Sequence, residues 1–181
     1  VETMTVGFGH GIAVSLLHLA SGYSTLFNGG IYRPATILKV DKSHPVGPGR
    51  RVFSEDTSYK MRSLLRLVVT KGTGKKADAP GHRVGGKTGT AEKYFNRSLK
   101  VTSFAGVFPM DEPRYVMVMM LDEPKATAET YGFHTAAWNI GPAFGVAVSR
   151  IAPMLGVRPD KTREPDMSAV LPFVHDKPDG K

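Results

Sequence analysis

The feature that most limits the fold is a run of three segments with a period of two, at residues 83–91, 101–109 and 114–121. Such a period is typical of strands that bury one face. Only the tetrapeptide Met110-Asp111-Glu112-Pro113 separates the last two segments, which predicts a tight antiparallel hairpin. Parallel strands would need long crossover connections, usually helices. Because the chain leaves no room for them here, the sequence predicts a three-stranded antiparallel meander.

Apolar residues at helical spacing predict three helices around this sheet. The first covers 16–28 and has Ser15 as its N-cap, and the second covers 55–70 and has Ser54 in that role. The third covers 136–155. The apolar residues that we expect to be buried are Met61, Leu64, Leu65 and Val68 in the second helix, and Val146, Ala147, Ile151 and Leu155 in the third.

The remaining segments carry weaker signals. We expect 31–40 to be an edge or irregular strand, because it contains a proline, 41–51 to be a polar loop, and 73–81 to be polar and flexible. The fold class is therefore α+β, an antiparallel sheet packed by helices. Residues 1–156 form the folded part, and residues 157–181, rich in Pro, Asp and Lys without periodicity, are expected to be a polar, mobile tail.

Composition excludes several classes of function. The chain has no cysteine, which removes disulfides, thiolate nucleophiles and cysteine metal sites. The six histidines lie without metal-ligand spacing, so we expect no metal and no cofactor. The net charge is +8, but the basic clusters lack interleaved aromatic residues, so nucleic acid is not an expected partner. No apolar run approaches the ~20 residues that span a bilayer.

The stretch GHRVGGKTGTAEK, residues 81–93, fits two different motifs. Gly81 followed by Gly86-Lys87-Thr88 fits the phosphate loop of nucleotide-binding proteins. Lys87-Thr88-Gly89-Thr90 fits the Lys-Thr-Gly strand of penicillin-interacting serine enzymes. One lysine cannot serve both mechanisms, so the surrounding sequence has to decide.

The surroundings disfavour a phosphate loop. That loop joins a buried strand to a helix whose N-terminus holds the phosphates. Here KGTGKKADAP precedes Gly81 and is no buried strand, and the residues after Thr88 have no helical apolar stripe. Asp122-Glu123 does resemble the acidic strand end that holds Mg²⁺ in such proteins, but it ends a strand before Pro124. Nucleotide binding stays a remote alternative.

The Lys-Thr-Gly motif suits an edge strand beside an acyl-transfer site. Gly86 and Gly89 leave bare positions along which a substrate can add as a further strand. Lys87 supplies positive charge for a substrate carboxylate and for the proton network of the nucleophile. The hydroxyls of Thr88 and Thr90 can bind that carboxylate, and the Thr90 amide can point at the oxyanion.

Several further segments follow in an order and spacing that resemble the class B, division-type (FtsI-like) transpeptidases among the penicillin-binding proteins. The resemblance covers residues 1 to about 160. The segments are GFGHGIAVSLLHLASGYSTLFNGGIYRP (7–34), RVFSEDTSYKMRSLLRLVV (51–69), GTGKKA (72–77), VGGKTGTAEK (84–93), SFAGVFP (103–109), VMVMMLDEP (116–124) and YGF (131–133).

This resemblance implies the C-terminal portion of a penicillin-binding protein or serine β-lactamase-like fold, and a D,D-transpeptidase activity. Such enzymes cross-link peptidoglycan stem peptides through an acyl-serine, and β-lactams acylate the same serine. Lys87, Thr88, Gly89 and Thr90 fall on the third motif box of the family. Tyr131 and Phe133 fall in a loop that borders the acyl-donor pocket, where simple anchoring of the loop by aromatic residues is an equal alternative. The resemblance also implies the periplasmic face of the bacterial inner membrane and membrane-protein partners of the divisome.

The chain departs from the family pattern at two motif boxes. No serine here is followed by lysine at the third position, and no Ser-x-Asn occurs. The Tyr94-Phe95-Asn96 stretch has a related look but the wrong order, and we interpret it as a strand connection. We therefore expect the nucleophile upstream of Val1 and no activity from this chain alone. A β-lactamase or carboxypeptidase relative, and a non-catalytic remnant of the fold, remain alternatives.

Overall fold

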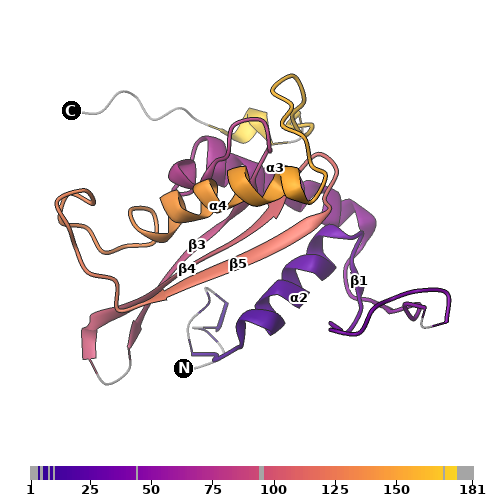
Figure 1. Cartoon of the computed structure of the whole chain (residues 1–181), viewed down its shortest axis with the longest axis horizontal. Coiled ribbons are helices and arrows are strands. Elements are labelled where there is room, and N and C mark those ends of the chain that lie inside the picture. The colour runs from indigo at the N-terminus through magenta and orange to yellow at the C-terminus, as the bar shows by residue number, and fades with distance from the viewer. Residues whose placement is uncertain are drawn as a thin grey trace.

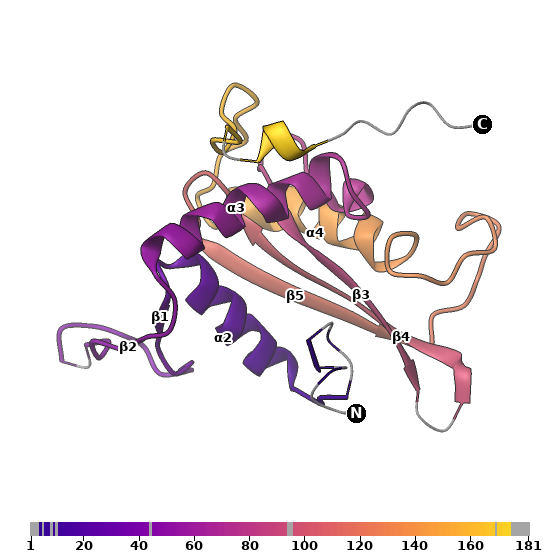
Figure 2. The same cartoon turned by 180° about the vertical axis from the view of Figure 1, so that it is seen from behind.

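The computed structural model describes residues 4, 6, 7, 9, 11–43, 45–93, 96–168 and 170–174. Its main sheet has the order β3-β4-β5. Helices α4 and α2 lie on opposite sides of this sheet, and α3 lies near the start of β3 (Figures 1 and 2). The bounds are α2 Leu16–Phe27, β1 Ile31–Tyr32, β2 Arg50–Arg51, α3 Glu55–Thr70, η1 Lys75–Ala77, β3 Gly85–Lys93, β4 Asn96–Phe108, β5 Tyr115–Asp122, α4 Ile140–Met154 and η2 Leu171–Phe173.

The three strands of the main sheet form the antiparallel meander that the sequence predicts. β3 pairs with β4 from Gly85↔Val107 onward, and β4 pairs with β5 from Val101↔Asp122 to Phe108↔Tyr115. β3 is therefore an edge strand. The Tyr94-Phe95 pair lies outside the described residues, and Asn96 begins β4.

The helix starts follow the capping residues of the sequence. The Ser15 side chain accepts a hydrogen bond from the amide of His18 at 3.2 Å, and Ser54 accepts from the amide of Thr57 at 3.0 Å. Each bond satisfies one of the amides that a helix N-terminus leaves without a partner. Gly29 follows α2 with a φ of +88°, the left-handed conformation that ends many helices.

The sheet separates two apolar cores. On the α4 side the rings of Phe104 and Phe144 meet with centroids 4.5 Å apart. On the α2 side Phe27 and Leu65 pack with Val107. Both faces of β4 are therefore covered, and the strand is held from two sides.

The buried face of α4 differs from the expected one. Val146 is 53% exposed and Ile151 is 39% exposed, whereas the buried residues are Ile140, Gly141, Phe144, Gly145, Val148 and Ala152. The reason is the close approach of α4 to η1, because a Cβ on Gly145 would lie 2.7 Å from the carbonyl oxygen of Asp78. Small residues make this contact, so the positions of the large apolar residues do not predict which face of α4 is buried.

The buried face of α3 also differs, because polar residues occupy part of it. Leu64 is 44% exposed, while Val69 is buried together with Ser63 and Arg66. The Ser63 hydroxyl donates to the carbonyl oxygen of Asp166 at 2.6 Å. Hydrogen bonds offset the free-energy cost of burying polar side chains. A search for apolar residues therefore misses these buried positions.

Two connecting segments are only partly as expected. Within 31–40 only Ile31–Tyr32 forms a strand, β1, and it pairs with β2 at the end of the expected polar loop. The 73–81 segment, expected to be flexible, contains η1 and buries Ala77 and Ala79 completely. Because alanine is small, two alanines in an otherwise polar stretch do not indicate from the sequence that the segment is buried.

Residues 157–168 contact the rest of the chain, and the mobility that the sequence predicts for this tail stays a prediction. Val157 is buried, the amide of Asp160 donates to the carbonyl oxygen of Gly81 at 2.8 Å, and Arg66 binds Glu164. These partners lie far away in sequence, so no local pattern signals them. The boundary at residue 156 stays a prediction.

Burial of one histidine makes stability depend on pH. His82 is only 3% exposed, and burial, with the neighbouring Arg83 charge, lowers its pKa below the ordinary 6.5. The unfolded chain therefore binds the proton first as the pH falls below about 6.5, and stability drops toward the folded-state pKa. We expect His82→Gln to remove this loss, which reaches at most ~1.4 kcal/mol per pH unit. Urea midpoints of both proteins at pH 7.5 and 5.5 test this, and parallel pH dependences would contradict it.

Candidate active site

The Lys-Thr-Gly-Thr motif lies within β3, at the edge of the sheet. Gly86 to Thr90 all belong to this strand, which pairs with β4 on one side only. Neither a loop nor a helix N-terminus surrounds Lys87 and Thr88, and the chain continues as strand to Lys93. A phosphate loop needs both features, so the geometry is against nucleotide binding.

The backbone of β3 presents alternate residues to its open edge. The carbonyl oxygen of Val84 accepts from Arg66 Nη1 at 2.7 Å, and the carbonyl oxygen of Thr88 accepts from Lys87 Nζ at 2.9 Å. Neither carbonyl is thus directed at β4. Because backbone groups alternate between the two edges of a strand, the N–H and C=O groups of Gly86, Thr88 and Thr90 point to the open edge.

Three side chains gather at this edge. Lys87 Nζ also lies 3.3 Å from the Thr88 hydroxyl oxygen, and the Thr88 and Thr73 hydroxyl oxygens are 3.0 Å apart. The ammonium and the two hydroxyls form a polar cluster that can bind a carboxylate. Thr73 is not among the site residues predicted from the sequence, although it lies in the GTGKKA segment that precedes the motif.

Thr90 links the motif to the segment before α4. Its hydroxyl oxygen accepts a hydrogen bond from the amide of Ala136 at 3.1 Å. The Thr90 hydroxyl can still donate its proton, so this geometry is compatible with the expected hydrogen bond from Thr90 to a carboxylate. The bond also connects the Tyr131–Trp138 segment to β3.

Loss of this bond should loosen the segment. Thr90→Val keeps the shape of the side chain but leaves the Ala136 amide without its acceptor, at a cost of ~1 kcal/mol. We expect faster hydrogen exchange at the amides of 131–138, whereas Thr90→Ser should exchange like the wild type. Equal exchange in the valine and wild-type proteins would show that the bond does not hold the segment.

Tyr131 and Phe133 flank the single tryptophan of the chain. The Phe133 ring stacks on Trp138 with centroids 5.2 Å apart, and the Tyr131 ring meets Trp138 edge-on at 5.4 Å. Lys76 Nζ lies 4.3 Å from the Trp138 ring centroid, a cation–π geometry. Tyr131 is 75% exposed and has a φ of +52°, which is rare for a side-chain-bearing residue. The aromatic residues therefore both anchor the loop and offer an exposed surface, and the sequence did not indicate Trp138 or Lys76.

The two glycines of the motif have different surroundings. A Cβ on Gly86 would lie 2.4 Å from the Ala105 carbonyl oxygen, in the backbone of β4. A Cβ on Gly89 would lie 2.5 Å from the Ser103 hydroxyl oxygen and otherwise meet nothing closer than 3.9 Å. Gly86 thus allows β3 to approach β4, and the open path for substrate that the sequence predicts at Gly86 and Gly89 stays a prediction.

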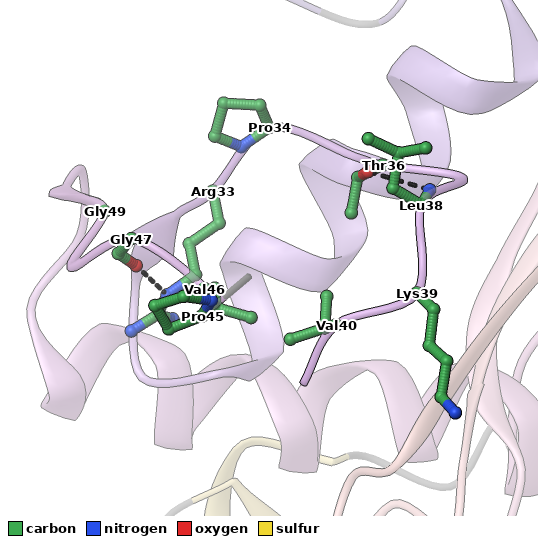
Figure 3. A pocket seen from close by; sticks show the side chains of 10 residues that line it. All are labelled: Arg33, Pro34, Thr36, Leu38, Lys39, Val40, Pro45, Val46, Gly47 and Gly49. Atoms are coloured by element: carbon green, nitrogen blue, oxygen red, sulfur yellow. Dashed lines mark hydrogen bonds between the residues drawn. The ribbon is translucent and has the colours of Figure 1, made fainter. Parts of the chain in front are cut away.

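A pocket of about 260 Å³ lies elsewhere, within the segment from Arg33 to Gly49. Arg33 and Gly47 both line it, and Arg33 Nε donates to the Gly47 carbonyl oxygen at 3.1 Å (Figure 3). None of the motif residues lines this pocket. Across the described residues, no three His, Asp or Glu side chains gather where they could hold a metal ion, and no helix is long and apolar enough to cross a membrane.

Comparison with known proteins identifies the class to which this fold and strand belong. The family described as the penicillin binding protein transpeptidase domain matches residues 1–140. The chain therefore belongs to the penicillin-binding protein transpeptidase family, and the resemblance and the α+β fold class inferred from sequence are confirmed.

Among the curated relatives of the chain are two transpeptidases named FtsI. The chain is 46% identical over 168 residues to the probable peptidoglycan D,D-transpeptidase FtsI of Caulobacter vibrioides, covering 85% of this chain and 28% of that protein. It is 36% identical over 167 residues to the peptidoglycan D,D-transpeptidase FtsI of Escherichia coli K12, covering 88% of this chain and 27% of that protein.

The solved transpeptidase domain of Burkholderia pseudomallei penicillin-binding protein 3 has the same fold. It superposes with a TM-score of 0.75 at 38% identity, over 86% of this chain and 46% of that chain. The chain therefore spans less than a third of these curated relatives and less than half of this solved domain.

Proposed function

We propose that this chain is the part of a peptidoglycan D,D-transpeptidase that supplies one wall of the acyl-transfer site. The observation that carries the proposal is the open edge of β3, where Lys87, Thr88 and Thr90 lie on the strand of a chain that belongs to the transpeptidase family. The names of its relatives, peptidoglycan D,D-transpeptidases, support the same activity.

In this proposal β3 binds the stem peptide as an added strand. The outward N–H and C=O groups of Gly86, Thr88 and Thr90 pair with its backbone. Lys87 and the hydroxyls of Thr88 and Thr90 bind its carboxylate. Gly89 leaves a bare position along the strand, and Tyr131 and Phe133 border the bound acyl donor.

The chemistry begins at a serine that this chain does not contain. Its oxygen attacks a peptide carbonyl carbon, the serine proton passes to a neighbouring base, and the carbonyl oxygen becomes an oxyanion. The Thr90 amide donates to that oxyanion, which lowers the barrier. The carbon–nitrogen bond then breaks and the amine leaves with a proton. An amine of a second stem peptide attacks the serine ester, which forms the cross-link and frees the serine.

The proposed partners follow from the same role. They are peptidoglycan stem peptides, β-lactams that acylate the serine, and membrane proteins of the divisome. The proposed location is the periplasmic face of the inner membrane, with the anchor in a part of the protein outside this chain. The relatives named peptidoglycan D,D-transpeptidase FtsI support the peptidoglycan substrate.

Labelling of the intact protein with a fluorescent penicillin tests the proposal. We expect a single labelled serine outside these 181 residues, and no label on this chain alone. A stem peptide with an added amine acceptor should give a cross-linked product. Hydrolysis without transfer would instead indicate a carboxypeptidase or β-lactamase, and the absence of any label would indicate a non-catalytic remnant.

A further inference from the structure

The segment that follows α4 returns to α3 and the start of β3 (Figures 1 and 2). We define the C-terminal strap as residues 157–168. The Asp160 amide donates to the carbonyl oxygen of Gly81 at 2.8 Å, and Arg83 Nη1 donates to the Asp160 carbonyl oxygen at 3.0 Å. Tyr59 donates its hydroxyl to Asp166 Oδ2 at 3.0 Å. The strap is thus tied both to α3 and to the residues that lead into β3.

A buried guanidinium connects the strap to the residue that directly precedes β3. Arg66 is only 4% exposed. Its Nε and Nη2 donate to the two Glu164 oxygens at 2.8 and 2.6 Å. Its Nη1 donates to Asp78 Oδ1 at 2.9 Å and to the Val84 carbonyl oxygen at 2.7 Å. One side chain therefore joins the strap, the segment after η1 and Val84, the residue directly before β3.

The position of Val84 gives this contact a consequence for the edge. Within β3 the carbonyl groups of residues 86, 88 and 90 point to the open side, and the Val84 carbonyl, one residue before the strand, precedes them in the same alternation. Arg66 occupies the Val84 carbonyl oxygen, so we expect an added strand to begin pairing at Gly86. Arg66 thereby limits where a bound peptide starts and where Lys87 and Thr90 lie relative to it.

Arg66 needs its acidic partners to stay in this place. A buried guanidinium is tolerated only when carboxylates and acceptors compensate its charge. Asp78, which is half-buried, supplies one carboxylate, and Glu164 supplies a two-point contact from the strap. Without the negative charge of Glu164, we expect the Arg66 guanidinium to turn toward Asp78 or toward water and to lose its hydrogen bond to the Val84 carbonyl oxygen.

We propose that Arg66 is a positioning residue for the acyl-transfer site and that Glu164 of the C-terminal strap holds it in position. In this way the strap, which does not belong to the motif, determines the residue of β3 at which a bound peptide begins to pair. This role rests on the proposed function of β3 as the peptide-binding strand. It gives the C-terminal segment a part in catalysis although none of its described residues belongs to the motif.

The test compares Glu164→Gln with Glu55→Gln in the intact protein. Both remove one negative charge, but Glu55 lies in the exposed first turn of α3 and pairs with Arg51. The first readout is acylation by fluorescent penicillin over a range of concentrations, which separates the acylation rate constant from the binding constant. The second is hydrogen exchange at the amides of 84–90, which needs no activity. Arg66→Lys, which keeps the charge but loses the two-point contact, is the second variant.

We expect Glu164→Gln to lower the acylation rate constant about tenfold and Arg66→Lys on the order of a hundredfold, as for small misplacements of catalytic groups. Both variants should exchange faster at 84–90, and Glu55→Gln should behave like the wild type. Normal acylation and exchange in a folded Glu164→Gln protein would overturn the proposal, even with a lower unfolding temperature. If no protein is acylated, the proposed function fails, while exchange at 84–90 still decides whether the strap positions β3.

Discussion

Lys87→Ala is expected to lower acylation of the intact protein by penicillin about 10²- to 10³-fold, the usual contribution of a group that moves protons or stabilises charge at the reacting centre. The ammonium lies at the open edge of β3, within hydrogen-bond distance of Thr88. Its removal takes away the positive charge for the carboxylate and for the proton network of the nucleophile. The second-order rate constant with fluorescent penicillin measures the effect.

Lys87→Arg is the matched variant, because it keeps the positive charge but does not give up its proton near neutral pH. Restored binding with a slow acylation step would assign Lys87 to proton transfer, and full recovery would assign it to electrostatic binding alone. Since Lys87 is exposed, neither change should alter the unfolding free energy by more than ~0.5 kcal/mol. Acylation of Lys87→Ala at the wild-type rate would remove this residue from the site.

Gly86→Ala should lower the free energy of unfolding by ~3 kcal/mol, at the upper end for insertion of a methyl group into a packed region. Its Cβ would lie 2.4 Å from the Ala105 carbonyl oxygen and 2.8 Å from the Gly106 Cα. Both are backbone atoms of β4, so β3 has to move away from its partner. Urea unfolding followed by tryptophan fluorescence measures the loss, and acylation should fall with it because the open edge shifts.

Gly89→Ala is the control on the same strand. Its Cβ would meet only the Ser103 hydroxyl, a side-chain atom that can rotate away. We expect a change in stability below ~1 kcal/mol, since a strained contact is relieved by one side-chain rotation. Equal losses in both variants would mean that glycine flexibility, rather than the approach of β4, explains Gly86.

The meander and the helix starts could be predicted because local rules decide them. The short link between β4 and β5, and the serines that cap α2 and α3, act over a few residues. The buried face of α4 could not be predicted, because its small residues Gly141 and Gly145 face η1. That contact depends on a segment more than sixty residues away in sequence.

The candidate site was predicted in part for the same reason. The motif from Gly86 to Thr90 is contiguous, so its chemistry shows in the sequence. The residues that place it are distant: Arg66 contacts Val84, and Glu164 contacts Arg66 across 98 positions. The catalytic roles given to Lys87, Thr88 and Thr90, and the binding roles of Tyr131 and Phe133, stay predictions.

A crystal structure of the intact protein acylated by penicillin tests the central claim most directly. The account predicts that the acyl carbonyl oxygen accepts from the Thr90 amide and that the carboxylate contacts the hydroxyls of Thr88 and Thr90. It also predicts that the adduct lies along the open edge of β3, starting at Gly86. An adduct bound away from β3, or an acyl oxygen held only by amides outside this chain, would contradict it.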